Sequence, residues 1–380
     1  RKESSAASDV YKRQAKNLQK KAMVARMRIK RRAAAPAEEQ QQEGRGVSTI
    51  GRRIAAGGGQ ARMKLPQIFA DDVNFNTVAR ETPGCSGADL AEILKRAAEI
   101  AESRKATRIT IADIRNAYQS LKLGDEMPRK QEFVDEFTTA VHEILGHAVV
   151  AGHSRQTLGR DHADNVQSMT IVPRGVALGA VWTSPTKDRV SQSQKYLLGR
   201  LRIAMAGQIA EKLYLGPDAV TSGASSDIQS ATGIANAMVS RFAMSGSTEL
   251  TFRDYNESDG FTSTKAKAEL VDQEIDDLLR DQYLRAEIIM LSYAAAKDAD
   301  GNDLTEMLAR AMLVKKTLQG EEFMRLISGE VVFDRAELDL GENEAEFQAL
   351  WKAQRAQRTR RIARLRNDPA TKDIAAEYGL

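Results

Sequence analysis

Two histidines and a glutamate, the residues of this chain best suited to metal chemistry, occur together in the stretch Val-His-Glu-Ile-Leu-Gly-His-Ala over residues 141–148. Neutral imidazoles are common zinc ligands, and a neighbouring carboxylate can take a proton from water at such a metal. In the H-E-x-x-H zinc motif the histidines stand four residues apart, so one face of an α-helix carries both. Here the spacing is five residues, which separates the two side chains by about 140° around a regular helix. A regular α-helix therefore cannot bring both imidazoles to one metal.

A π-helical turn between His142 and His147 would absorb the extra residue, and such turns are frequent at functional sites. Gly146 makes this distortion easier because it has no Cβ. We therefore predict a local irregularity in this helix. Regular hydrogen bonding throughout the helix would instead indicate structural or surface histidines. No other histidine stands four residues from either one, and we interpret His153 and His162 as loop or surface residues.

The helix that must carry these residues has an apolar stripe with helical spacing, formed by Phe133, Phe137, Val141, Ile144 and Ala148. Two strand-like runs separated by turn residues follow, which predicts a small sheet around residues 169–184. A second helix is expected where Ser225 or Ser226 can act as its N-cap, with Asp227 in its first turn. Its expected apolar face comprises Ile228, Ala231, Ala235, Met238 and Phe242. From the residues alone, helix capping explains Asp227 as well as metal binding does.

Three further segments of the chain read Met-Thr-Ile-Val-Pro-Arg-Gly at 169–175, Ala-Met-Ala-Gly-Gln-Ile-Ala-Glu-Lys-Leu at 204–213 and Val-Thr-Ser-Gly-Ala-Ser-Ser-Asp-Ile-Gln at 220–229. In this order and spacing they resemble the peptidase domain of the FtsH family of membrane-bound AAA+ zinc metalloproteases. Residues 271–289 and 316–323 are similar to that family's long C-terminal helix and closing segment. The likeness extends over roughly residues 66–330.

The resemblance implies one zinc ion per chain, held by His142, His147 and Asp227, with Glu143 as the general base. Two imidazoles and one carboxylate would leave a fourth zinc position open for catalysis. This chain departs from the family at Ile144-Leu145, where the family has a single residue. The departure concerns the metal site and leaves the expected fold unchanged.

Residues 82–90, Thr-Pro-Gly-Cys-Ser-Gly-Ala-Asp-Leu, begin a helical segment in which Ser86 and Asp89 can form a capping pair. Thr110 repeats the pattern with Asp113. The segment resembles the lid subdomain of an AAA+ ATPase, whose Gly-Ala pair, here residues 87 and 88, approaches the bound nucleotide. No G-x-x-x-x-G-K-[ST] motif occurs in the chain. The resemblance thus implies ATP only for an ATPase core absent from this sequence, and we expect no ATP hydrolysis by this chain alone.

Basic residues gather near the two ends of the chain, whose formal net charge is only +4. Residues 1–35 contain twelve Lys or Arg and two Asp or Glu, and residues 352–366 contain seven Lys or Arg and no acid. Such ends can bind nucleic acid or anionic lipid, but no aromatic residues alternate with the charges to stack on bases. We interpret them as a solvated arm and a solvated terminal helix.

The single Cys85 excludes an internal disulfide framework. The sequence contains no run of 18 apolar residues, so it predicts no membrane-spanning helix in this chain.

We therefore predict a mainly α-helical chain with a small β-sheet, in which a helical lid subdomain precedes an FtsH-like zinc-peptidase domain. The expected parts are a disordered basic arm and linker at 1–65, an AAA+ lid-like subdomain at 66–126, the peptidase domain at 127–335 and a basic helical tail at 336–380.

The predicted function is that of a zinc-dependent endopeptidase within an ATP-dependent, membrane-associated protease that degrades unfolded or membrane proteins. The family resemblance implies a homo- or hetero-hexamer with other FtsH-type subunits, membrane attachment through a segment absent from this chain, and no nucleic-acid partner. An extended peptide would bind along a sheet edge. One alternative is an inactive pseudo-peptidase that serves as a hexamer scaffold because the extra residue has destroyed the zinc site. The other is a nucleic-acid-binding protein that uses its two basic ends.

Overall fold

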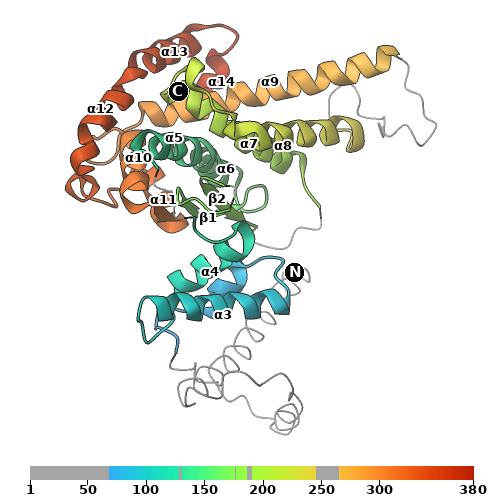
Figure 1. Ribbon diagram of the computed structural model, residues 1–380. Helices are drawn as coiled ribbons and strands as arrows, with labels where there is room; N and C mark the ends of the chain where they lie inside the picture. Colours follow the sequence, from blue (N-terminus) through green and yellow to red (C-terminus); the bar gives the residue numbers. More distant parts are fainter. Residues whose placement is uncertain (1–67, 128–130, 176, 186–190, 245–264) are drawn as a thin grey trace, which may run out of the picture. The chain divides into compact units, whose positions relative to one another are not determined.

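The computed structural model describes residues 68–127, 131–175, 177–185, 191–244 and 265–380 (Figure 1). The expected arm and linker at 1–65 lie outside the described residues. The chain divides into two compact units, Arg1–Asp125 and Glu126–Leu380. None of the described helices combines the length and the apolar character that crossing a membrane requires.

The first unit contains three described helices, α2 (Phe75–Glu81), α3 (Gly87–Ser103) and α4 (Ile111–Leu123). Both predicted capping pairs are present, because Ser86 with Asp89 and Thr110 with Asp113 form reciprocal capping boxes at the starts of α3 and α4. The three helices share one apolar core, which includes Phe75, Val78, Leu90, Ile93, Leu94, Ala97, Ile114 and Ala117. This part of the chain is therefore a small helical bundle, which agrees with the predicted helical lid subdomain.

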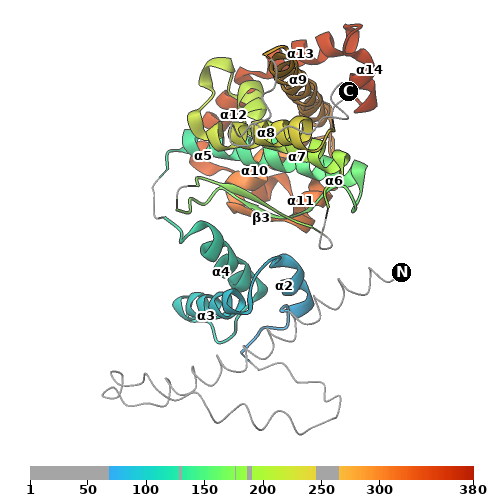
Figure 2. The same ribbon diagram turned by 90° about the vertical axis from the view of Figure 1, so that its right-hand side faces the viewer.

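The second unit is built mainly from helices. Their bounds are α5 (Phe133–Ala140), η1 (Val141–Ala148), α6 (Val149–Leu158), α7 (Gln194–Tyr214), α8 (Ser225–Asn236), η4 (Ala237–Arg241), α9 (Lys265–Ala295), α10 (Leu304–Lys315), α11 (Gly320–Ile327), α12 (Glu344–Ala353), α13 (Arg355–Asn367) and α14 (Lys372–Glu377). Short 3-10 turns lie at Pro217–Ala219, Ser222–Ala224, Arg335–Leu338 and Gly341–Asn343. Helices α5, α6, α7, α8 and α10 lie on one side of the sheet (Figure 2).

The sheet has three antiparallel strands in the order β2-β1-β3, where β1 is Asn165–Thr170, β2 is Ala180–Ser184 and β3 is Thr317–Gln319. The sequence predicts the sheet around residues 169–184, but β1 begins four residues earlier than that range. The third strand was not predicted, because a run of three residues is too short to show a period of two. In the described sheet β2 is an edge strand, and it lines the pocket described below.

Helices α5, η1 and α6 follow one another without a break and pass closely over α7. A Cβ atom added at Gly146 would lie 2.8 Å from the carbonyl oxygen of Ala206 and 2.9 Å from the Cα of Gly207. The two backbones can approach this closely only because glycines stand at the crossing point. Gly146 therefore serves the packing of η1 against α7, in addition to the helix distortion that the sequence suggests.

The C-terminal tail is helical, but the expectation of a solvated terminal helix is wrong for part of it. Phe347, Trp351 and Leu365 are buried in the apolar core of the second unit. The guanidinium of Arg358 is also buried, 4.3 Å from the centre of the Tyr214 ring and 5.2 Å from that of Trp351. It donates hydrogen bonds to the backbone carbonyls of Leu213 and Trp351, which together with the two aromatic rings stabilise its charge. A run of basic residues can therefore belong to a helix that packs against the core.

Candidate metal centre and cleft

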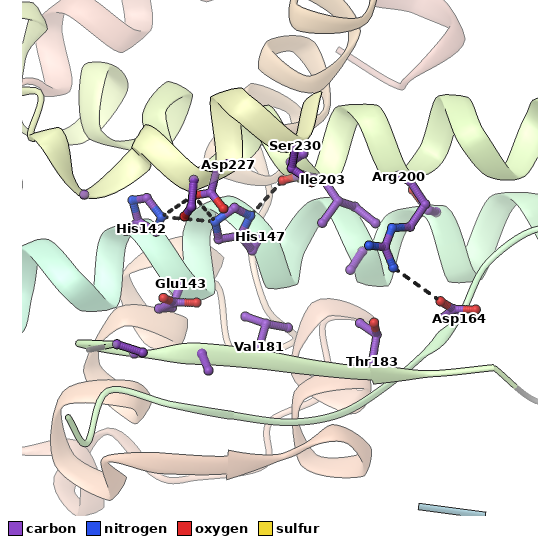
Figure 3. A pocket seen from close by; sticks show the side chains of 18 of the residues that line it. His142, Glu143, His147, Asp164, Val181, Thr183, Arg200, Ile203, Asp227 and Ser230 are labelled. Atoms are coloured by element: carbon purple, nitrogen blue, oxygen red, sulfur yellow. Dashed lines mark hydrogen bonds and ion pairs between the residues drawn. The ribbon is translucent and has the colours of Figure 1, made fainter. Parts of the chain in front are cut away.

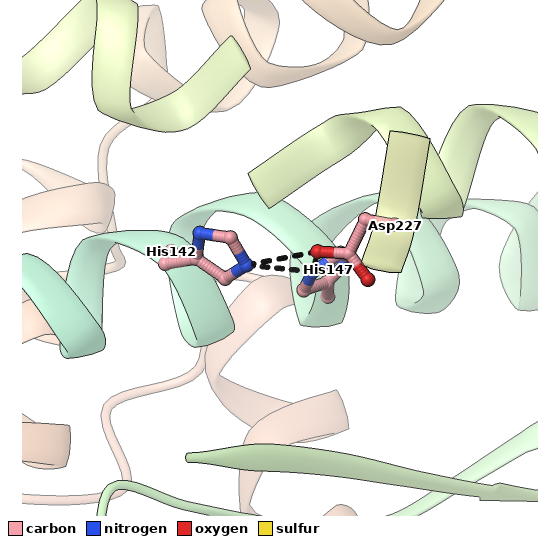
Figure 4. A group of neighbouring side chains, drawn as sticks. All are labelled: His142, His147 and Asp227. Atoms are coloured by element: carbon pink, nitrogen blue, oxygen red, sulfur yellow. Dashed lines mark hydrogen bonds and ion pairs between the residues drawn. The ribbon is translucent and has the colours of Figure 1, made fainter. Parts of the chain in front are cut away.

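Residues Val141–Ala148 form a π-helix, so the predicted irregularity is present. In a π-helix each N–H bonds to the carbonyl five residues earlier, and residues five apart come to lie on the same side. The imidazoles of His142 and His147 therefore converge, with their Nε2 atoms 3.0 Å apart (Figure 4). The five-residue spacing is accommodated by the backbone of this helix.

Asp227 lies in the first turn of α8, with its Oδ2 atom 3.2 Å from the Nε2 atom of each histidine (Figure 4). One ligand atom from each residue lies within 4.8 Å of the other two, which suits a single metal ion. The predicted serine cap is wrong, because the N-cap residue is Ala224 and no side chain caps this helix. The predicted apolar face of α8 holds only in part, since Ile228 is 37% exposed and Phe242 is 49% exposed.

The Nδ1 atom of each histidine is held by a buried acceptor. That of His142 donates to a carboxylate oxygen of Glu211 at 2.7 Å, and that of His147 donates to the carbonyl oxygen of Ile203 at 2.7 Å. Because Nδ1 is the donor to these acceptors, Nε2 is the atom of each histidine that faces the shared point, and a metal bound there would displace any proton on it. Glu211 also accepts a hydrogen bond from the backbone N–H of Thr221 at 2.6 Å.

Sequence reasoning gave no role to Glu211, although the residue stands inside one of the segments that carry the family resemblance. The available signal was an acidic residue in the apolar run Ile209-Ala210-Glu211, since an acid on the buried face of a helix needs a partner. The side chain of Glu211 is 1% exposed in the structure.

The charges around the histidines favour a cation at the point that the three ligand atoms share. Burial lowers the pKa of His142, but hydrogen bonds with Asp227 and Glu211 outweigh it and raise this pKa to about 10. Burial raises the pKa of Asp227, but hydrogen bonds with the two histidines outweigh it and hold this pKa well below its usual range. Two carboxylates around two imidazoles thus stabilise positive charge, which is the property that a divalent metal site needs.

Glu143 lies beside the three candidate ligand residues, between η1 and strand β2 (Figure 3). Its side chain is nearly buried, and this burial raises its pKa against the opposing effect of His147 and His142. A Cβ atom added at Gly179 would lie 2.7 Å from the Cγ of Glu143 and 2.9 Å from Thr170 O, so this glycine leaves room for the carboxylate. The position and environment of Glu143 suit a proton acceptor.

A pocket of about 570 Å³ opens onto these residues and is lined by η1, α7, α8 and β2 (Figure 3). His162 also lines the pocket; it stands in a turn, partly buried, with Nδ1 2.8 Å from the hydroxyl of Ser193.

The interpretation of His153 as a loop or surface residue is wrong. It lies on α6, partly buried against the rings of Tyr293 and Tyr378. Burial lowers the pKa of His153 to about 4.

Comparison with known proteins identifies two regions. The profile of peptidase family M41 matches residues 132–326, and that of the AAA+ lid domain matches residues 72–116. The ATP-dependent zinc metalloprotease FtsH 3 of Synechocystis sp. is 30% identical over 276 residues, which cover 69% of this chain and 42% of that protein. The ATP-dependent zinc metalloprotease FtsH of Caulobacter vibrioides is 36% identical over 265 residues, which cover 69% of this chain and 41% of that protein.

A third relative, the ATP-dependent zinc metalloprotease FtsH 3 of Conexibacter woesei, is 40% identical over 177 residues, or 47% of this chain and 22% of that protein. The chain thus spans about two fifths or less of the length of these relatives. The M41 match covers the π-helix, the pocket and Asp227, and the lid match covers α2, α3 and the first part of α4. The chain therefore belongs to peptidase family M41 and carries an FtsH-type zinc metalloprotease domain together with an AAA+ lid domain.

Proposed function

We propose that this domain is a zinc-dependent endopeptidase in which His142, His147 and Asp227 hold the metal and Glu143 is the general base. The observation that carries the proposal is the convergence of one ligand atom from each of the three residues, within 4.8 Å, despite the extra residue in the motif. Two nitrogens and one carboxylate oxygen are a typical ligand set for catalytic zinc, and they leave one position open. The Nδ1 acceptors of both histidines support the same assignment.

Zinc, when bound, supplies a Lewis acid that polarises the peptide carbonyl and favours deprotonation of water. The two histidines and Asp227 fix its place, while Glu211 and the carbonyl of Ile203 fix the orientation of the imidazoles. Glu143 accepts the proton of the attacking water and delivers it to the amine nitrogen as the C–N bond breaks. Burial raises the pKa of Glu143, so its carboxylate is a stronger base than that of an exposed glutamate.

We propose unfolded polypeptide as the substrate. Strand β2 is an edge strand that lines the pocket, with Val181 and Thr183 facing it (Figure 3). An extended peptide can pair with the free backbone groups of such an edge and pass along the metal centre. A pocket of about 570 Å³ admits a few extended residues and excludes a folded domain.

The wider assembly is proposed from the family alone. A homo- or hetero-hexamer with other FtsH-type subunits would use ATP in its AAA+ part to unfold substrates and deliver them to this domain. The match to an AAA+ lid and the names of the relatives support this arrangement. Membrane association rests on the same resemblance, and we expect no nucleic-acid partner. Native mass spectrometry of the chain and of its co-purified complexes measures the composition of the assembly directly.

The alternative of a zinc-free pseudo-peptidase scaffold required imidazoles that diverge on a regular helix. The convergence of these imidazoles supports the peptidase instead. The test is zinc content and casein cleavage by the purified oligomer without ATP. We expect one zinc per chain and cleavage, with Glu143→Gln retaining zinc and losing cleavage. Zinc-free oligomers that do not cleave casein would contradict the proposed peptidase function and support the alternative of a scaffold.

A further inference from the structure

We infer that Arg200 makes one end of the cleft a subsite selective for an acidic side chain of the substrate. The inference rests on the proposed peptidase function, because it concerns the peptide that occupies the same cleft. It names a specificity-determining residue rather than a participant in the chemistry.

Arg200 stands on α7, the helix that also supports the metal centre, and it lines the same pocket. It precedes by three residues Ile203, whose carbonyl oxygen holds His147, so it lies about 4.5 Å further along the helix axis. Arg200 and Asp164 occupy the end of the pocket beyond Ile203 as seen from the histidines, and Thr183 of β2 faces them (Figure 3). The guanidinium is therefore displaced to one side of the metal centre along the direction of the edge strand.

The cation at this end of the cleft is more open to solvent than its acidic neighbour. The side chain of Arg200 is 45% exposed, whereas that of Asp164 is 9% exposed. Their nearest atoms are 3.9 Å apart, which is too long for a hydrogen bond, and the same oxygen of Asp164 accepts a hydrogen bond from the hydroxyl of Tyr196 at 3.0 Å. A substrate side chain entering this end would thus meet the guanidinium rather than the carboxylate.

These positions fix the expected selectivity. An extended peptide advances about 3.3 Å per residue, so a displacement of about 4.5 Å along α7 corresponds to one or two residues from the scissile bond. A carboxylate at that position can accept charge-assisted hydrogen bonds from Arg200, whereas a lysine or arginine there meets a like charge. Because the guanidinium is half-exposed, we expect about a two- to fivefold preference for Glu over Gln, and only on one side of the bond.

The experiment uses peptides that are identical except at one position, which carries Glu, Gln or Lys and is scanned across the residues that flank the scissile bond. For the wild-type chain, kcat/KM for Glu relative to Gln should be raised at one position and close to one elsewhere. Arg200→Gln should bring the raised ratio to about one, and Arg200→Glu should make Lys the preferred residue there. Arg280→Gln on α9, which removes a 76% exposed arginine whose ion pairs with Asp277 at 3.5 Å and Asp276 at 3.7 Å lie outside the pocket lining, should keep the wild-type ratio.

Fluorescence anisotropy measures the binding of the same peptides to the Glu143→Gln chain, and this tests the subsite without cleavage. If the wild-type chain cleaves nothing, the proposed peptidase function fails, yet the binding ratio of Glu to Gln peptides still reports on Arg200. A ratio near one at every position, or a ratio that the Arg200 substitutions leave unchanged, overturns the inference. Reversal of the preference by Arg200→Glu supports it, because a loss of folding cannot produce a reversed selectivity.

Discussion

His142 is fixed from three directions, and each constraint comes from a different part of the chain. Glu211 accepts the hydrogen bond of its Nδ1 atom, Asp227 faces its Nε2 atom, and Gly207 lies close to the Cε1 and Nε2 side of its ring. The first two are electrostatic and the third is purely steric. The steric constraint is the easiest one to test in isolation, because glycine can be replaced by alanine without adding charge or hydrogen bonds.

We predict that Gly207→Ala greatly weakens zinc binding. Its Cβ would lie 2.4 Å from both Cε1 and Nε2 of His142, inside any normal contact distance, so the imidazole must leave the shared point. Titration of zinc against a chromophoric chelator measures the affinity. Gly233→Ala on α8 is the matched control, since its Cβ meets nothing within 4 Å, and it should keep zinc and gain about 1 kcal/mol of stability. Equal zinc affinity in both variants would contradict the placement of His142.

At the scale of elements, the π-helix is what reconciles the motif with the fold. Helices α5 and α6 continue on either side of it, and Ile144 and Leu145 are both buried within it. The extra residue therefore changes the winding of a short segment and leaves both flanking helices in place.

We predict that deleting Leu145 converts this segment to a regular α-helix and keeps zinc binding. The deletion restores the four-residue spacing, at which an α-helix places both histidines on one face. The lost buried side chain costs about 2–5 kcal/mol, so Leu145→Ala, which keeps the length of the chain, is the control for volume alone. Zinc content and amide hydrogen exchange along the helix are the measurements. A folded deletion variant without zinc, beside a zinc-bound Leu145→Ala, would show that the site depends on the π-helix itself.

The elements that sequence alone predicts are those with local signals. Capping pairs mark the starts of α3 and α4, and an apolar stripe marks the helix that carries His142. The irregularity in that helix was also predictable, because a regular α-helix cannot bring His142 and His147, which stand five residues apart, to one metal. Strand β3 and the burial of Arg358 were not predictable, since they depend on partners far away in sequence. The same holds for Asp227, which local reasoning assigns equally well to a helix cap.

At the scale of the molecule, His153 connects three helices of the second unit and is a source of acid sensitivity. It stands on α6 against Tyr293 of α9 and Tyr378 of α14, and its Nε2 atom has no hydrogen-bond partner within the described residues. Its pKa in the folded chain is lowered to about 4 by burial and by the charge of Arg202, below the ordinary value of 6.5. The folded chain therefore favours the neutral form of His153, and protonation of this residue destabilises the fold.

We predict that the free energy of unfolding falls as pH decreases from 6.5 toward 4, because the unfolded chain binds a proton that folded His153 rejects. The loss reaches at most about 3 kcal/mol and is complete below pH 4. Above pH 6.5 the residue contributes no pH dependence. Urea unfolding of the wild type and of His153→Gln across this range measures the difference, and parallel pH profiles would contradict the prediction.

Zinc itself should stabilise the second unit of the molecule and leave the first unchanged. The three proposed ligand residues stand on η1 and α8, which are about 80 residues apart in sequence, and all belong to the unit Glu126–Leu380. Free zinc at a hundredfold excess over its Kd stabilises a folded state by about 2.7 kcal/mol, or about 5–10 °C in Tm for a domain of this size. Calorimetry with zinc and with a chelator should show this shift in one transition only. Asp227→Asn should abolish the shift, since it removes the anionic ligand while keeping the shape of the side chain. An equal shift in that variant would place the stabilising zinc elsewhere on the chain.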